Sequence, residues 1–96
     1  MTLEELRIEK GPAIRAIAAR HGVTGIRVFG SFARGDAGPG SDLDLLIETG
    51  PVRTPFFPGG LVADLEAELG MRIDVTTQRS LHPGLRDSVL REAVAF

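Results

Sequence analysis

The chain has 96 residues, enough for one small domain, and its 43% hydrophobic and 25% charged residues are ordinary for a globular protein. The lack of Cys excludes disulfides and thiolate metal sites, and a net charge of −2 does not favour nucleic acid as a partner. No apolar run reaches the length of a membrane span and no signal peptide is evident, so we expect one cytoplasmic domain over residues 1–96.

The first predicted element is a helix. Thr2 can cap it, and Glu5 stands three residues later in the capping-box position. Apolar residues then recur at roughly helical spacing: Leu3, Leu6, Ala13, Ile14, Ile17 and Ala18. Because Pro12 lacks an amide hydrogen and clashes with the preceding turn, we expect a kink or two short helices before His21–Gly22 ends the segment.

Three runs have the composition and alternation of β-strands, namely residues 26–29, 42–48 and 71–75. A helix over residues 61–69 connects the second run to the third, and a last helix follows Pro83. The short loop between the first two strands favours antiparallel pairing, whereas a helical crossover favours parallel pairing. The sequence therefore predicts an α+β fold, with a small three-stranded mixed sheet flanked by about four helices.

The segment Pro51–Gly60 is unusually rich in Pro and Gly. It could be a mobile lid or a loop that docks a partner, and the sequence leaves its role open. Phe56 and Phe57 lie within it, and we expect both in the core rather than on an exposed contact surface.

An anion-binding turn is predicted where the first strand ends at Gly30–Ser31. Gly allows a ligand to approach the backbone closely, and a Ser that opens a helical turn offers its hydroxyl and exposed amides. A plain turn followed by a helix cap would explain the same two residues.

The second strand carries Asp42-x-Asp44, and the two-residue period of a strand points both carboxylates the same way. Mg²⁺ takes one or two such carboxylates together with phosphate oxygens and water. A solvated edge strand is the alternative, although Asp is a poor strand residue.

Asp74 alternates out of the third strand and would share the face of Asp42 and Asp44 if the strands are neighbours. Three crowded carboxylates repel one another and need a cation. A phosphate seat with three carboxylates fits two-metal phosphoryl transfer, in which positioning and charge do most of the work.

The run from Gly30 to Gly35, followed by Ser41-Asp42-Leu43-Asp44-Leu45, resembles the signature of the minimal nucleotidyltransferases of the DNA polymerase beta superfamily. The resemblance extends over nearly the whole chain, with Arg72-Ile73-Asp74-Val75 as the later strand. It implies a nucleotidyltransferase fold and a reaction that moves AMP, or another nucleoside monophosphate, from a triphosphate such as ATP to a hydroxyl.

The resemblance also implies roles for single residues. The catalytic and metal-binding residues would be Asp42, Asp44 and Asp74, with two Mg²⁺ ions. The nucleotide-binding residues would be Gly30, Ser31, Arg34 and Ser41, although Arg34 could instead pair with Asp36 or Asp42. His21 and His82 are expected to be structural, because this chemistry needs no His base.

Proteins with this signature often act as antitoxins beside a HEPN-domain toxin, in some cases by transferring AMP to its tyrosines. The resemblance therefore implies a HEPN toxin as partner. Two alternatives stay open: a non-catalytic antitoxin that covers its partner, and transfer to a small molecule. The nucleotide base, the acceptor and the oligomeric state are not fixed by the sequence.

Overall fold

The computed structural model describes residues 1–51 and 54–96. In chain order its elements are α1 (Leu3–Arg20), β1 (Val23–Phe29), α2 (Ser31–Arg34), β2 (Leu43–Thr49), α3 (Gly59–Leu69), β3 (Ile73–Thr77), α4 (Pro83–Glu92) and β4 (Val94–Ala95). The strand order is β3-β2-β1-β4, with β1 antiparallel to both β2 and β4, and β2 parallel to β3. The predicted α+β class and the mixed pairing are confirmed.

Helix α1 begins with the predicted capping box. The Glu5 amide donates to Thr2 Oγ1 at 3.1 Å, and the Thr2 amide donates to Glu5 Oε1 at 3.0 Å. The alternative of two short helices is wrong, because α1 is a single helix from Leu3 to Arg20 with Pro12 inside it. Leu6 before this residue and Ile14 after it are both fully buried. Packing on both sides of Pro12 thus outweighs the missing amide bond.

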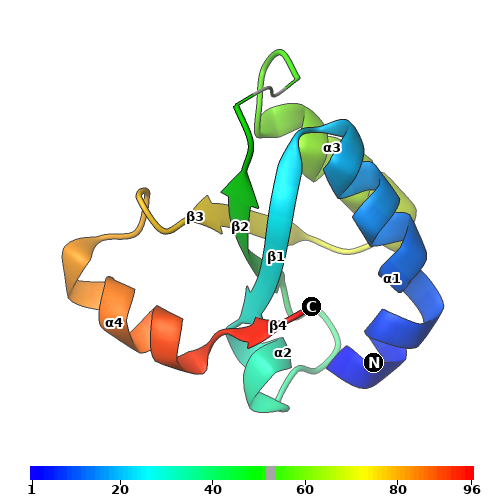
Figure 1. Cartoon of the computed structure of the whole chain (residues 1–96). Helices are drawn as coiled ribbons and strands as arrows, with labels where there is room; N and C mark the ends of the chain where they lie inside the picture. Colours follow the sequence, from blue (N-terminus) through cyan, green and yellow to red (C-terminus); the bar gives the residue numbers. More distant parts are fainter. Residues whose placement is uncertain (52–53) are drawn as a thin grey trace.

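The core lies between the sheet and the pair of helices α1 and α3, which cover the same side of it (Figure 1). Leu43, Leu45 and Ile47 alternate along β2 and are buried there, as the sequence predicts. Leu61 and Leu65 bring α3 into the same cluster. Helix α4 lies on the other side of the sheet and contains no buried residue.

The sheet has a fourth strand, β4, which the sequence analysis does not predict. Its two residues, Val94 and Ala95, pair with Val28 and Arg27 at the edge of β1. A strand this short carries no periodic signal, so only contacts with distant parts of the chain define it.

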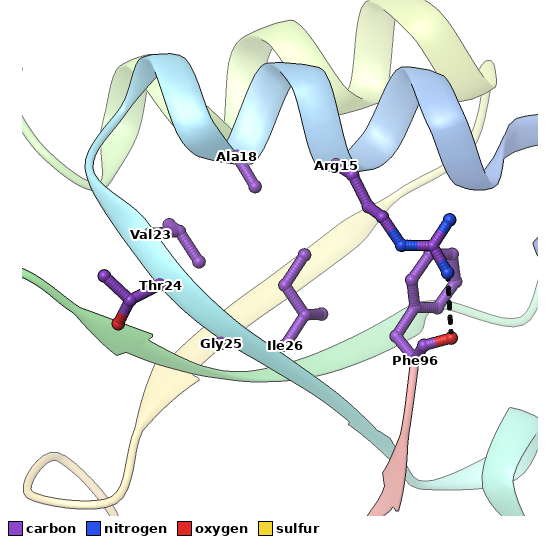
Figure 2. A pocket seen from close by; sticks show the side chains of 7 residues that line it. All are labelled: Arg15, Ala18, Val23, Thr24, Gly25, Ile26 and Phe96. Atoms are coloured by element: carbon purple, nitrogen blue, oxygen red, sulfur yellow. Dashed lines mark hydrogen bonds between the residues drawn. The ribbon is translucent and has the colours of Figure 1, made fainter.

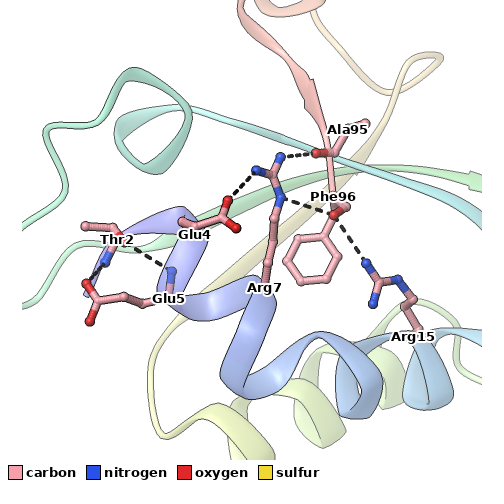
Figure 3. Close-up of polar contacts among 7 residues, drawn as sticks. All are labelled: Thr2, Glu4, Glu5, Arg7, Arg15, Ala95 and Phe96. Atoms are coloured by element: carbon pink, nitrogen blue, oxygen red, sulfur yellow. Dashed lines mark hydrogen bonds and ion pairs between the residues drawn. The ribbon is translucent and has the colours of Figure 1, made fainter.

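Two arginines of α1 hold the segment that follows α4 (Figure 3). Arg7 donates through Nε to the Phe96 carbonyl at 3.2 Å and through Nη2 to the Ala95 carbonyl. Arg15 donates to the Phe96 carbonyl at 3.4 Å, and its guanidinium carbon lies 5.3 Å from the centre of the Phe96 ring. Figure 2 shows this ring at one end of a pocket of about 300 Å³ between α1 and β1.

The Pro-rich segment after β2 places its two aromatics differently. Phe57 packs against the core, as expected, whereas Phe56 is 93% exposed and its predicted burial is wrong. Phe56 has a positive φ of 62°, in a turn where the Gly59 amide donates to its carbonyl at 2.8 Å. Val52 and Arg53, within the segment whose role the sequence leaves open, lie outside the described residues. Within the described ranges, no helix has the length and apolar character to cross a membrane.

Candidate active site

A glycine with an unusual backbone conformation ends β1 at the predicted anion-binding turn. Gly30 has a φ of 75° and ψ of −152°, which L-residues rarely adopt. A Cβ at this position would overlap Asp44 Oδ2 and lie 3.0 Å from Asp44 Cγ. Gly30 is therefore required both to turn the chain into α2 and to let the Asp44 carboxylate lie against the backbone.

The register of the sheet brings two of the three predicted carboxylates side by side. Asp44 of β2 and Asp74 of β3 are direct partners in the parallel ladder. The pKa of Asp44 is raised above its ordinary value by burial, and further by the negative charges of Asp74 and Asp42. Three like charges thus act on one another at this end of β2, as the spacing of the sequence indicates.

An open cleft of about 610 Å³ collects most of the predicted site residues. It is lined by Gly30, Ser31, Arg34, Gly40, Ser41, Asp42, Asp44 and Arg72. Asp74 lies beside Asp44 in register but is not among the lining residues. The fold therefore places residues from the β1–α2 turn, from the loop before β2 and from the start of β2 around one space.

The two serines of the motif occupy different parts of the cleft. The Ser41 hydroxyl accepts a hydrogen bond from the Gly38 amide at 2.9 Å, which shapes the loop before β2. The Ser31 hydroxyl makes no hydrogen bond within the described part of the chain, and Ser31 opens α2. Ser31 is thus the serine whose hydroxyl is available to a ligand.

Two cations face this acidic cleft. Arg34 donates to Asp36 Oδ2 at 3.3 Å and to Glu92 Oε1 at 2.8 Å, and these carboxylates raise its pKa above the ordinary value. Arg72 lies 3.7 Å from Asp42 Oδ1, so Asp42 pairs with Arg72 rather than with Arg34. Of the two ion pairs that the sequence analysis considers for Arg34, the structure contains the one with Asp36 and not the one with Asp42. Arg34 still lines the cleft.

Sequence reasoning misses two residues of the site. Arg72 lines the cleft, and its side chain is 85% exposed. It stands two residues before Asp74, where the sequence does not distinguish it from an ordinary surface charge. Glu92 is the last residue of α4 and belongs to no motif in the sequence, yet its carboxylate accepts hydrogen bonds from Gly30 and Arg34. Only the tertiary fold could reveal it, because it lies 62 residues from Gly30.

The carboxylate oxygens in the cleft are suitable ligands for Mg²⁺ that is also bound by the phosphates of a nucleotide. Within the described ranges, no three His or acidic side chains converge closely enough to enclose a metal ion unaided. Mg²⁺, however, usually takes one or two carboxylates and completes its shell with substrate phosphates and water. Asp42 and Asp44 supply those carboxylates, and the mutual repulsion felt by Asp44 is the condition that a cation relieves.

Both histidines make structural contacts, as predicted. His21 is buried at the end of α1, with Nδ1 2.6 Å from Thr54 Oγ1 and Nε2 2.7 Å from Asp64 Oδ2. His82 caps α4, and its Nδ1 accepts from the Gly84 amide at 3.0 Å. Neither histidine lines the cleft.

Relatives with known names share most of this chain. It is 37% identical over 94 residues to the protein adenylyltransferase MntA of Thermococcus cleftensis, covering 98% of this chain and 95% of that protein. It is 41% identical over 78 residues to MJ0435 of Methanocaldococcus jannaschii, which is assigned as a protein adenylyltransferase, covering 81% of this chain and 84% of the relative.

Solved structures agree with the fold. A protein assigned as a minimal nucleotidyltransferase is 46% identical, with a TM-score of 0.82 over 100% of this chain and 97% of its own. A toxin–antitoxin crystal structure with AMP-PNP contains a chain with a TM-score of 0.73 at 19% identity, over 91% of this chain and 71% of that one. At that identity the likeness concerns the fold alone.

The family profile of the nucleotidyltransferase domain matches residues 13–96, a range that includes every residue lining the cleft. With the paired carboxylates, the Gly-Ser turn and the relatives just described, this match shows that the chain belongs to the nucleotidyltransferase domain family and is a nucleotidyltransferase.

Proposed function

We propose that this enzyme is a Mg²⁺-dependent protein adenylyltransferase that acts as an antitoxin by transferring AMP from ATP to a tyrosine hydroxyl of a HEPN-domain toxin. The observation that carries the proposal is the cleft itself. It brings Asp42 and Asp44 together with the Gly30–Ser31 turn, with Asp74 beside Asp44 in the sheet. Few other groups are needed, because phosphoryl transfer depends mainly on positioning and charge.

Five of the lining residues have a task in this reaction. The Ser31 hydroxyl and the Arg34 guanidinium bind the triphosphate, and Ser41 holds the loop that borders it. Asp42 and Asp44 hold the Mg²⁺ ions, with Asp74 completing the set. When bound, Mg²⁺ neutralises the triphosphate charge and favours the ionised acceptor hydroxyl.

The chemical step exchanges one bond for another. The acceptor oxygen forms a bond to the α-phosphorus while the bond from that phosphorus to the oxygen of the β-phosphate breaks. Pyrophosphate leaves with the electron pair, and the acceptor proton passes towards Asp74, which is exposed to solvent. Arg34 stays in contact with the departing charge.

A protein acceptor suits this cleft better than a small one. The cleft is open, and its walls are glycines and polar or charged side chains that offer little apolar surface to enclose a small acceptor. A protein brings its own surface to the reaction. The names of the Thermococcus cleftensis and Methanocaldococcus jannaschii relatives support the same class of acceptor.

Two observations support a toxin as the partner: the comparisons with MntA proteins and the exposed surface of α4. MntA is the name of a relative that is 37% identical, and a solved toxin–antitoxin of MntA with HpeT contains a chain of the same fold. On this chain, α4 has no buried residue and Leu85 is 57% exposed, so apolar surface is available to a partner. This surface also favours the second candidate, an antitoxin that neutralises its toxin by covering it.

The test uses the purified chain, Mg²⁺ and ATP labelled in the α-phosphate, with and without the protein encoded beside it. We expect label on that neighbour after denaturing electrophoresis, and none with the Asp42→Asn, Asp44→Asn double variant. Tight binding of the neighbour without label would support the covering antitoxin instead. Label on an added small hydroxyl compound alone would indicate a small-molecule acceptor.

A further inference from the structure

The last residue of α4 forms a two-point contact with the nucleotide cleft. Glu92 Oε2 accepts from the Gly30 amide at 2.8 Å, and Glu92 Oε1 accepts from Arg34 Nη1 at 2.8 Å. These two hydrogen bonds, of which the one to Arg34 is an ion pair, lower the pKa of Glu92 below its ordinary value. One carboxylate therefore connects α4 to both ends of the short α2 segment.

Glu92 contacts two residues that line the cleft but does not line it itself. Gly30 and Arg34 both line the cleft, whereas Glu92 is not among the lining residues. The Glu92 side chain is 27% exposed and that of Arg34 is 52% exposed. A triphosphate in the cleft would therefore meet Arg34 without having to displace Glu92.

The hydrogen bonds of Arg34 leave part of its guanidinium for a ligand. Nε donates to Asp36 and Nη1 donates to Glu92, while Nη2 makes no hydrogen bond within the described part of the chain. A planar group held at two of its three nitrogens has one orientation, and its remaining N–H groups point in a fixed direction. This preorganisation is what bidentate recognition of phosphate requires.

We propose that Glu92 is a positioning residue for nucleotide binding: it fixes the Gly30 turn and orients Arg34 towards the triphosphate. The identity of the ligand rests on the proposed function. The active site then includes the C-terminal segment, because the attachment of β4 to β1 and of Phe96 to Arg7 brings Glu92 to α2. It also gives a role to a helix that adds no residue to the core.

The decisive variant is Glu92→Gln. The amide oxygen can accept from Gly30 or from Arg34 but not both, since its NH₂ group would face the other donor. We expect Mg²⁺ with α,β-methylene-ATP to bind about tenfold more weakly by titration calorimetry, consistent with loss of a charge-assisted bond. Glu92→Asp keeps the charge on a shorter side chain and should recover part of the affinity.

A double-mutant cycle separates positioning from a general structural role. If Glu92 acts through Arg34, Glu92→Gln should have little further effect in an Arg34→Ala background, within about twofold. Additive effects of the two changes would overturn the proposal, as would unchanged or tighter binding by Glu92→Gln. Glu48→Gln is the matched control. Glu48 is an exposed carboxylate that pairs with Arg27 at 3.8 Å, and neither residue lines the cleft.

The binding assay also distinguishes this proposal from the proposed function. If the Glu92→Gln variant binds the ATP analogue as tightly as wild type, and wild type transfers label to the neighbouring protein, only the positioning role is overturned. Wild type that binds the analogue and labels no protein would overturn only protein adenylylation. Wild type that does not bind the analogue would overturn both. A merely structural Glu92 would lower the unfolding midpoint and leave affinity and KM for ATP unchanged.

Discussion

The two sides of the sheet make different use of helices. On one side, α1 and α3 bury large side chains such as Leu6, Ile14 and Leu65 almost completely. On the other side, α4 contains no buried residue and is joined to the rest through Glu92 and the short strand β4. The first side supplies most of the apolar burial that stabilises the fold, and the second contributes polar contacts to the cleft. Stability and activity should therefore respond to different substitutions.

The largest effect on activity is expected for Asp44→Asn. Loss of this carboxylate should lower transfer by about 1000-fold, because several kcal/mol of metal-assisted charge stabilisation are lost. The fold should persist with equal or higher stability, since repulsion from Asp42 and Asp74 is relieved. Radiolabel transfer and urea unfolding in EDTA measure the two quantities. Asp87→Asn, at an exposed position on α4, is the control, and marked unfolding of Asp44→Asn would contradict the assignment.

The comparison of the two sides is tested directly by one substitution made on each. Leu65→Ala on α3 removes a side chain that is 1% exposed and should cost about 2–5 kcal/mol of unfolding free energy. Leu85→Ala on α4 removes one that is 57% exposed and should cost less than about 0.5 kcal/mol. Urea unfolding followed by circular dichroism measures both. Equal costs would show that α4 is packed as tightly as α3.

The core side can be strengthened at Pro12. A proline within a helix is about 3 kcal/mol less favourable than alanine. Part of this cost is offset because proline also lowers the conformational entropy of the unfolded chain. Pro12→Ala should thus stabilise the protein by about 2 kcal/mol without changing nucleotide affinity. Pro39→Ala, at an exposed loop position, controls for the unfolded-state term. Destabilisation of Pro12→Ala would show that α1 needs the proline geometry.

The smallest effects are expected from pH, and they have opposite signs at two residues. Glu92 has a lowered pKa, so its contribution to stability is present above its ordinary pKa of 4.5 and is lost as the pH falls through the lowered value. Asp44 has a raised pKa, so protonation as the pH falls relieves the repulsion and favours the folded state.

Unfolding free energies measured between neutral and acidic pH in EDTA would separate these contributions. Glu92→Gln should flatten the loss of stability on acidification, and Asp44→Asn should remove the compensating gain. Identical profiles for both variants and wild type would show that neither group is coupled to folding.

The sequence predicts the elements whose signals are local. The capping box of Thr2 and Glu5 and the alternation along β2 are both visible in short windows of the sequence. The Asp42-x-Asp44 spacing likewise predicts two carboxylates on one cleft wall. Local chemistry and tertiary structure agree at these positions.

The features that the sequence does not predict depend on distant contacts. Pro12 stays within one helix because core packing holds both sides of it, and Phe56 is exposed because a turn with positive φ directs the chain outward. Strand β4 and Glu92 acquire their roles only when the chain returns to β1 and α2. No window of the sequence contains both partners of these contacts.

The bonds from Arg7 to Ala95 and Phe96 join residues 88 and 89 positions apart. Closing so long a loop costs more chain entropy than forming the β1–β2 hairpin, whose strands are adjacent in sequence. We therefore expect the hairpin and α1 to organise first and the C-terminal segment to dock late in folding. A transient species with an intact hydrophobic core would then still lack a finished nucleotide cleft, so enzymatic competence would appear only at the final kinetic step.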